Sequence, residues 1–319
     1  MDKFENKEKK RMQKMNRKTF FYELLLLFGT FIWGVAFIFQ DMGNQYVDPI
    51  TFNVERCLVA FVFLFGLYFV FRFIEKRKQK PEDTEADKPH YTFKNWVQGS
   101  LVCGIFLALG MVTQQIGISF EGAGKSGFLT ALYIVFVPIF GLIGGKKPSL
   151  LVWCGIGISV VGLLLINVSE SGFSWGQGSW LLLGCAIAYA FQILAVSHFV
   201  HQVHPVLLSA GEFFFAFLLQ LPFMFIFENP QIGSMVDAWL PVLFCGVASS
   251  GIAYTIQIIA QKNIPPTIAS IIMSMESVFA ILTSVACGFE RFSFIEYFGC
   301  AVIFCAILVA QLPSKSEKA

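Results

Sequence analysis

Four of the ionisable residues in or at the start of otherwise apolar stretches of the chain are the first candidates for chemistry. Arg56, Glu212 and Glu276 lie inside such stretches, and Lys125 opens another. A charged side chain that faces lipid is costly, so in membrane proteins these residues usually face a polar cavity or a partner charge. We therefore examine them for substrate contact, gating and proton transfer.

Arg56 and Glu212 each lie seven residues into an apolar run, about 10 Å along a helix. One interpretation is a polar tier on each side of a central cavity, which would gate or contact a substrate. The alternative is a structural contact in which Arg56 pairs with the neighbouring Glu55 or with Asp41.

Lys125 opens its apolar run near the expected interface, where its long side chain can reach lipid headgroups. A cation at a helix N-terminus is disfavoured by the helix dipole, so we expect a compensating anion. A substrate carboxylate, Glu121 or Glu276 could supply it.

Glu276 lies eleven residues into its run, about 16 Å from the start and a comparable length from the other end. This position makes Glu276 the candidate for proton coupling or for binding a substrate ammonium. The alternative is a protonated or paired carboxyl group that holds helices together by hydrogen bonds.

Aromatic and amide side chains at middle depth complete the candidate site. An indole or phenol away from the interface needs a polar partner, which a cavity provides, although a satisfied core aromatic is the commoner outcome. The two amides could line the same pathway or bridge helices. These residues are Trp33, Tyr133, Tyr189, Tyr254, Gln115 and Gln257.

The composition indicates the elements that must position these residues. Of 319 residues, 56% are hydrophobic and 14% are charged, against about 25% charged in soluble domains. An ordinary soluble enzyme is thereby excluded. A bilayer crossing needs about 20 apolar residues and must be helical here. Ten runs qualify, near residues 20–40, 49–73, 96–118, 124–143, 149–167, 177–199, 205–227, 237–260, 265–287 and 293–311.

Several classes of site are not expected from the sequence. The eight cysteines lie in apolar runs without CxxC spacing, and the four histidines form no metal-ligand pattern. No GxxxxGK[ST] motif is present, and a net charge of +2 gives no indication of nucleic-acid binding. We therefore expect no metal, cofactor, ATP hydrolysis or nucleic-acid partner.

The basic residues predict the orientation. With ten crossings and the N-terminus inside, twenty of the 23 lysines and arginines fall on one face. Basic residues are retained on the cytoplasmic side during insertion. We therefore expect both termini, residues 1–19 and 312–319, in the cytoplasm.

The two halves of the chain show a weak internal repeat. At an offset of 156 residues Trp33 aligns with Tyr189 and Arg56 with Glu212, and at 142 Gln115 aligns with Gln257. Residues 20–167 and 177–311 would each hold five crossings. Because five is odd, the second half would enter the membrane in the opposite sense, as in the inverted repeats of many secondary transporters.

Several sequence segments resemble the drug/metabolite transporter superfamily, in particular its ten-helix EamA branch. They are Trp33-Gly34-Val35-Ala36-Phe37, Arg56, Lys125 to Gly141, and Met275 to Ser293 with Gly299. One difference is Ser277, where the family often has proline; the counterpart in the first half, Pro138, is present. A pair of kinks in the fourth and ninth helices is therefore in doubt on one side.

The predicted fold is an all-α integral membrane protein with ten transmembrane helices in two inverted five-helix repeats. The resemblance implies a bacterial plasma-membrane secondary transporter that exports or exchanges small metabolites, such as amino acids or related compounds, by alternating access. Protons are a possible coupling ion, and the oligomeric state is not predicted. The alternatives are a membrane-embedded enzyme, although no HExxH or GxSxG motif is present, and a lipid-translocating or scaffold protein.

Overall fold

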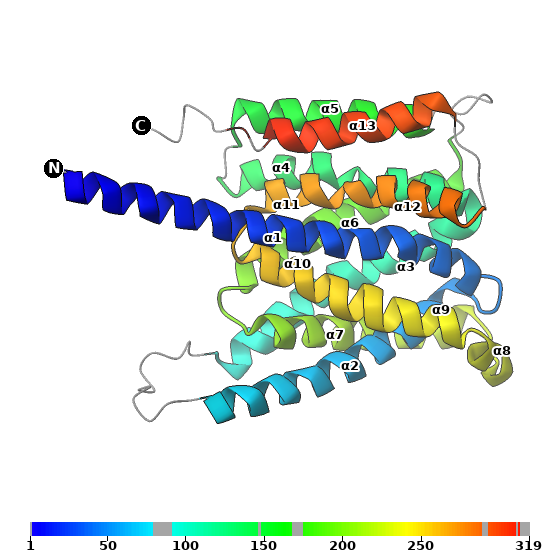
Figure 1. The fold of residues 1–319 in the computed structure, drawn as a ribbon. Coiled ribbons are helices and arrows are strands. Elements are labelled where there is room, and N and C mark those ends of the chain that lie inside the picture. The colour runs from blue at the N-terminus through cyan, green and yellow to red at the C-terminus, as the bar shows by residue number, and fades with distance from the viewer. Residues whose placement is uncertain are drawn as a thin grey trace.

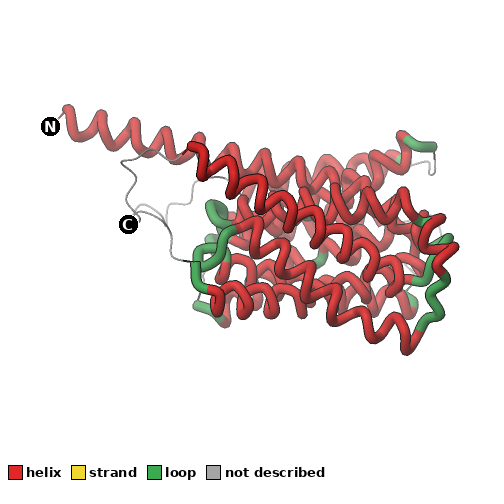
Figure 2. Tube along the Cα trace, turned by 90° about the horizontal axis from the view of Figure 1, so that it is seen from below, coloured by secondary structure: helices red, strands yellow, loops and turns green. Residues whose placement is uncertain are grey.

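The computed structural model describes residues 2–78, 91–145, 148–167, 175–288, 293–310 and 312, so nearly all of the expected C-terminal tail lies outside it. Every regular element within these residues is a helix (Figures 1 and 2). The first half contains α1 (Asp2–Gly43), α2 (Pro49–Lys78), α3 (Phe93–Ala131), α4 (Tyr133–Ile143) and α5 (Leu150–Asn167). The second half contains α6 (Gln177–Phe199), α7 (Pro205–Phe227), α8 (Ile232–Asp237), α9 (Trp239–Leu243), the π-helix η2 (Phe244–Ala253), α10 (Tyr254–Gln261), α11 (Pro266–Met273), α12 (Met275–Ala286) and α13 (Phe294–Ala310).

Among the described residues, seven helical segments are long and apolar enough to cross a membrane. One of these segments, Phe93–Ile143, is 51 residues long, and two further apolar helices, Leu150–Leu165 and Phe294–Ala310, are shorter. Large apolar side chains are exposed along the sides of the bundle, as lipid contact requires. The chain is thus an all-helical membrane protein.

Side chains and proline define where several helices begin. Thr92 caps α3 by accepting a hydrogen bond from the Asn95 amide at 3.2 Å. Pro205 occupies the first turn of α7, where the missing amide proton has no cost. The carboxylate of Glu228, which follows α7, accepts hydrogen bonds from the Ile50 and Thr51 amides at 2.8 and 2.7 Å. This cap links the end of α7 to the start of α2.

Three interruptions occur along the helical segments in the described part of the bundle. Gly122 has φ 75° and ψ 175°, a conformation that side chains disfavour, and it divides α3 into two helical parts. This break lies between the apolar runs expected at residues 96–118 and 124–143. Further along the chain, Leu132 separates α3 from α4, and Ser274 separates α11 from α12. Each of these two breaks is one tightened turn, because Leu132 (φ −61°, ψ −10°) and Ser274 (φ −61°, ψ −15°) keep right-handed helical angles. Such a turn lies in the residues expected for the fourth helix and in those expected for the ninth, where the kink was in doubt.

Ser277 takes part in helix packing at the position where the family often has proline. Its hydroxyl donates a hydrogen bond to the Gly127 carbonyl at 2.8 Å and so joins α12 to the second part of α3. The interruption at Ser274 therefore forms without a proline.

The bundle brings helices from the two halves into contact. The pairs α3 and α6, α2 and α7, α5 and α13, and α1 and α12 lie side by side. Gly34 allows a close approach of α1 to α12, because a methyl group there would lie 2.8 Å from the Ala280 nitrogen. The first turns of α1 project beyond the bundle at the end where α13 finishes (Figures 1 and 2).

Candidate functional site

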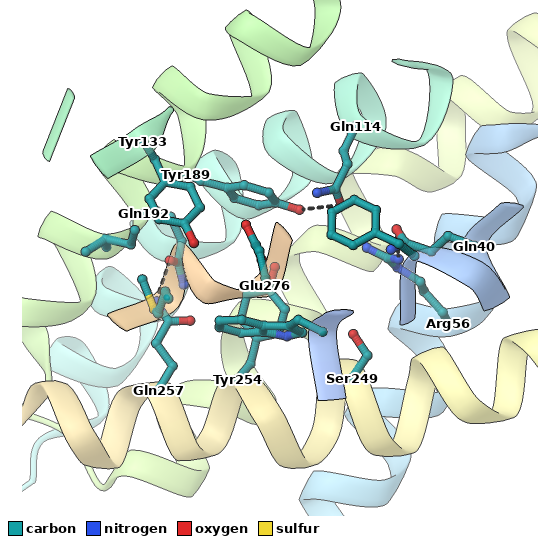
Figure 3. A pocket seen from close by; sticks show the side chains of 14 residues that line it. Gln40, Arg56, Gln114, Tyr133, Tyr189, Gln192, Ser249, Tyr254, Gln257 and Glu276 are labelled. Atoms are coloured by element: carbon teal, nitrogen blue, oxygen red, sulfur yellow. Dashed lines mark hydrogen bonds between the residues drawn. The ribbon is translucent and has the colours of Figure 1, made fainter. Parts of the chain in front are cut away.

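A cavity lies at the centre of the bundle, where helices from both halves meet (Figure 3). Its lining combines one cation, one carboxylate, several amides and an aromatic wall. The lining residues are Trp33, Phe37, Gln40, Arg56, Gln114, Tyr133, Tyr189, Gln192, Ile193, Ser249, Tyr254, Gln257, Met273 and Glu276.

Seven of the ten residues predicted from the sequence line this cavity. They are Trp33, Arg56, Tyr133, Tyr189, Tyr254, Gln257 and Glu276. The other three, Gln115, Lys125 and Glu212, lie outside the lining. The structure thus brings together side chains separated by more than 200 positions in the sequence.

Arg56 is 2% exposed and enters the cavity from α2. Its Nη1 donates a hydrogen bond to Gln40 Oε1 at 2.7 Å, and its Nε has no hydrogen-bond partner among the described residues. The expected structural alternative named Glu55 or Asp41, whereas the partner is a neutral amide. The positive charge therefore has no paired carboxylate within the described part of the protein.

Glu276 lies in the first turn of α12, immediately after the interruption at Ser274, and is 5% exposed. Its Oε1 has no hydrogen-bond partner within the described ranges. Tyr133, the first residue of α4 after the break at Leu132, also turns its hydroxyl into the cavity (Figure 3).

Aromatic rings form much of the cavity wall. The rings of Trp33 and Tyr254 meet edge to face, with centroids 4.9 Å apart, and Tyr254 packs in the same way on Phe213. The Tyr189 hydroxyl donates a hydrogen bond to Gln114 Oε1 at 3.1 Å (Figure 3). The indole nitrogen of Trp33 is buried without an acceptor among the described residues, which leaves a donor at the cavity wall.

Glu212 lies behind the cavity wall and contacts the lining through an amide. It is fully buried, and its Oε2 accepts a hydrogen bond from Gln192 Nε2 at 3.0 Å. Gln192 Oε1 in turn accepts from Gln257 Nε2 at 3.1 Å. Glu212 was expected to face the cavity directly. It instead contacts the lining residue Gln192 from behind.

Gln115 and Lys125 have contacts of the structural kind that the sequence also allowed. Gln115 Nε2 donates to the Gln40 carbonyl at 3.0 Å and to Asn44 Oδ1 at 2.8 Å, which ties α3 to the end of α1. Lys125 forms an ion pair with Glu121 at 2.6 Å, so one of the three expected anions compensates it. The second oxygen of Glu121 accepts from the Ser179 hydroxyl at 2.7 Å.

The sequence analysis missed several polar residues of the lining, namely Gln40, Gln114, Gln192 and Ser249. All four lie within apolar runs. Neutral amides are also costly in lipid when they lack partners. The sequence analysis considered only the two amides aligned by the repeat, Gln115 and Gln257; a search of every amide in the apolar runs would have found three of the four.

Comparison with known proteins identifies the family. The model of the EamA-like transporter family matches residues 20–168 and again residues 176–311. The chain belongs to this family and is a multi-pass membrane transporter.

Curated relatives agree with this assignment. A protein of Archaeoglobus fulgidus named an uncharacterized transporter is 25% identical over 300 residues, which cover 92% of this chain and 87% of that protein. The Escherichia coli K12 protein named uncharacterized inner membrane transporter YedA is 25% identical, with 92% of each chain covered. The Bacillus subtilis protein named uncharacterized transporter YoaV is 24% identical and covers 88% of this chain.

A solved crystal structure shares the fold. It superimposes with a TM-score of 0.73 at 17% identity and covers 93% of this chain and 98% of that chain. This likeness concerns the fold alone.

Proposed function

We propose that the protein is a secondary transporter that exports or exchanges small organic metabolites, such as amino acids or related compounds, by alternating access. The observation that carries this proposal is the central cavity, which holds the cation of Arg56 and the carboxyl group of Glu276 between helices of both halves. Buried groups of both signs suit a small solute that carries a carboxylate and an ammonium group.

The proposed architecture has ten crossings in two inverted repeats, residues 20–167 and 177–311. The 51 residues of Phe93–Ile143 would extend about 76 Å as one helix, against about 30 Å of hydrocarbon, so a turn at Gly122 into two crossings is favoured. The shorter α5 and α13 would be the fifth and tenth crossings.

Helix packing supports the inverted repeat. In the proposed repeat, α1 corresponds to α6 and α4 corresponds to α12. The contact of α1 with α12 should therefore have a counterpart between α6 and α4, and both contacts are present. Exchange of the halves also maps α2 with α7 and α5 with α13 onto themselves. The breaks at Leu132 and Ser274 lie at equivalent positions, to within one residue.

We place both ends of the chain in the cytoplasm. The projecting start of α1, the end of α13 and the end of α2, with Arg72 and Arg77, lie at the same end of the bundle (Figure 1). Basic residues favour the cytoplasmic side.

The proposal also assigns proton coupling to Glu276. Alternating access would expose this buried carboxyl group to each side in turn, so proton binding and release would accompany substrate movement. Glu276→Gln keeps the size and removes the titration.

Reconstituted vesicles test this function. Vesicles that contain the purified protein are loaded with the twenty standard L-amino acids, and mass spectrometry follows their release. We expect saturable release of one or more of them, faster under an inward proton gradient, and we expect Glu276→Gln to exchange substrate but to lose the acceleration. Release equal to that of protein-free vesicles would refute the proposed substrate class, and a full gradient effect in Glu276→Gln would refute the coupling role.

A further inference from the structure

Two buried amide or carboxyl oxygen atoms of the cavity lining have no hydrogen-bond donor among the residues that the structure describes. They are Oε1 of Gln257 and Oε1 of Glu276, residues that are 1% and 5% exposed. The Tyr133 hydroxyl is a third buried oxygen atom without a partner among the described residues, and unlike the other two it can itself donate. A buried acceptor without a donor is unfavourable, and a ligand that brings N–H groups relieves it. Gln257 lies at the end of the cavity opposite Arg56 (Figure 3).

The amide of Gln257 is oriented from one side by a backbone carbonyl. The carbonyl of Ile193 can only accept, so Gln261 must turn its Nε2 towards it, at 3.0 Å. Gln261 Oε1 then faces Gln257 and accepts from its Nε2 at 3.0 Å. The nitrogen of the Gln257 amide is thereby directed towards Gln261 and away from the space that a ligand would occupy.

Glu212 anchors the same amide from the other side. Its Oε2 accepts from Gln192 Nε2, which leaves Gln192 Oε1 to accept the second N–H of Gln257. Both N–H groups of Gln257 are used, so only its oxygen remains for a ligand.

We propose that Gln257 determines substrate specificity by selecting ammonium groups that carry N–H bonds over fully N-methylated ones, with Glu212, Gln192 and Gln261 as positioning residues. This inference rests on the proposed transport function. The carboxylate of Glu276 attracts any cation, methylated or not, through its charge. A neutral amide oxygen gains little from a cation without N–H groups, so the discrimination falls to Gln257.

A methylation series of amino acids tests the inference. Vesicles with the full-length protein are loaded with the standard L-amino acids or with their N-monomethyl, N,N-dimethyl and N,N,N-trimethyl derivatives. We expect release to fall at least about tenfold at the third methyl group, which removes the last N–H. A gradual decline with each methyl group, or equal release of all derivatives, would show a size effect or no selection and would overturn the inference.

Variants distinguish the orientation of the Gln257 amide from the charge of Glu212 and from a loss of folded protein. Gln257→Leu and Glu212→Leu are expected to reduce the ratio of dimethyl to trimethyl release several-fold. Glu212→Gln should retain the ratio, because its amide oxygen can still accept from Gln192. A lower ratio of dimethyl to trimethyl release in Glu212→Gln would overturn the positioning role of Glu212. Should Glu212→Leu fail to fold, Gln192→Leu breaks the same link.

A matched control is Gln220→Met. Gln220 is a buried amide on α7 that donates to the Ala216 carbonyl at 3.1 Å. It takes no part in the hydrogen bonds that join Glu212, Gln192, Gln257 and Gln261. In Gln220→Met the ratio of dimethyl to trimethyl release should equal that of the wild type. If this ratio fell as much as in Gln257→Leu, it would report general damage to the protein, and the inference would be overturned. Absence of release for every unmethylated amino acid would instead refute the proposed function itself.

Discussion

Replacement of Arg56 by methionine tests the role of the cavity cation. Methionine has a similar length and no charge, so Arg56→Met removes the guanidinium group and retains much of the buried volume. Arg56 donates to Gln40 Oε1 and leaves its Nε without a described partner. The change therefore removes one intramolecular hydrogen bond and any bond to the substrate.

The two effects differ in size. A hydrogen bond to a charged group contributes about 1.5–3 kcal/mol, so loss of the bond to a substrate carboxylate should lower kcat/KM about ten- to one-hundred-fold. The stability of the fold changes in two opposite ways. Gln40 Oε1 loses its donor, which costs about 1–3 kcal/mol of folding free energy. The Arg56 charge, on a residue that is 2% exposed, is removed, and with it the cost of burying that charge. We therefore expect transport to fall much more than folded yield.

Amino-acid release from vesicles, divided by the amount of monodisperse protein, provides the measurement. Gln40→Met is the matched control, because it removes the partner of Arg56 and keeps the cation; we expect a several-fold loss at most. Normal transport per folded molecule in Arg56→Met, together with a low yield, would show that Arg56 is structural and would refute the cavity role.

Two further predictions concern packing and topology. Gly34→Ala should destabilise the protein by about 1–3 kcal/mol, because its methyl group would meet backbone atoms of α12. The control is Gly127→Ala on α3, which also faces α12; its methyl group finds ordinary contact distances, so this variant should melt at or slightly above the wild-type temperature. Thermal unfolding in detergent measures both, and equal melting temperatures would contradict the close approach of α1. For topology, cysteine at Gln231 should react with an impermeant reagent from outside and cysteine at Lys262 should not, in a background without the exposed native cysteines. The reverse labelling pattern would refute the cytoplasmic placement of the termini.

The sequence predicted the depth of the site residues better than their direction. Depth follows from the number of residues along a helix at 1.5 Å each, and three residues chosen on this basis, Trp33, Arg56 and Glu276, line the cavity. Direction changes by about 100° per residue, so a small shift moves a side chain to another face. For this reason Gln114 lines the cavity, whereas the predicted Gln115 bridges α3 to α1.

The helix breaks show a second limit of sequence reasoning. The break at Gly122 was readable, because glycine next to a polar residue favours a turn. The break at Ser274 has no proline or glycine to indicate it, and the carboxyl group of Glu276 enters the cavity directly after it. Only the packed helices define this interruption.

The equivalent positions of the two halves suggest how a repeated fold becomes selective. At an offset of 143 residues, Tyr133 aligns with Glu276, and Val135-Phe136 aligns with Val278-Phe279. Both Tyr133 and Glu276 follow a helix break and enter the same cavity, one as a neutral hydroxyl group and the other as an acid. Arg56 and Glu212 differ in the same way, with opposite charges at aligned positions. In the proposed mechanism the similar backbones permit the exchange between two access states. The unlike side chains give the cavity a fixed polarity, so a substrate with two different charged ends would be held in one orientation throughout the cycle.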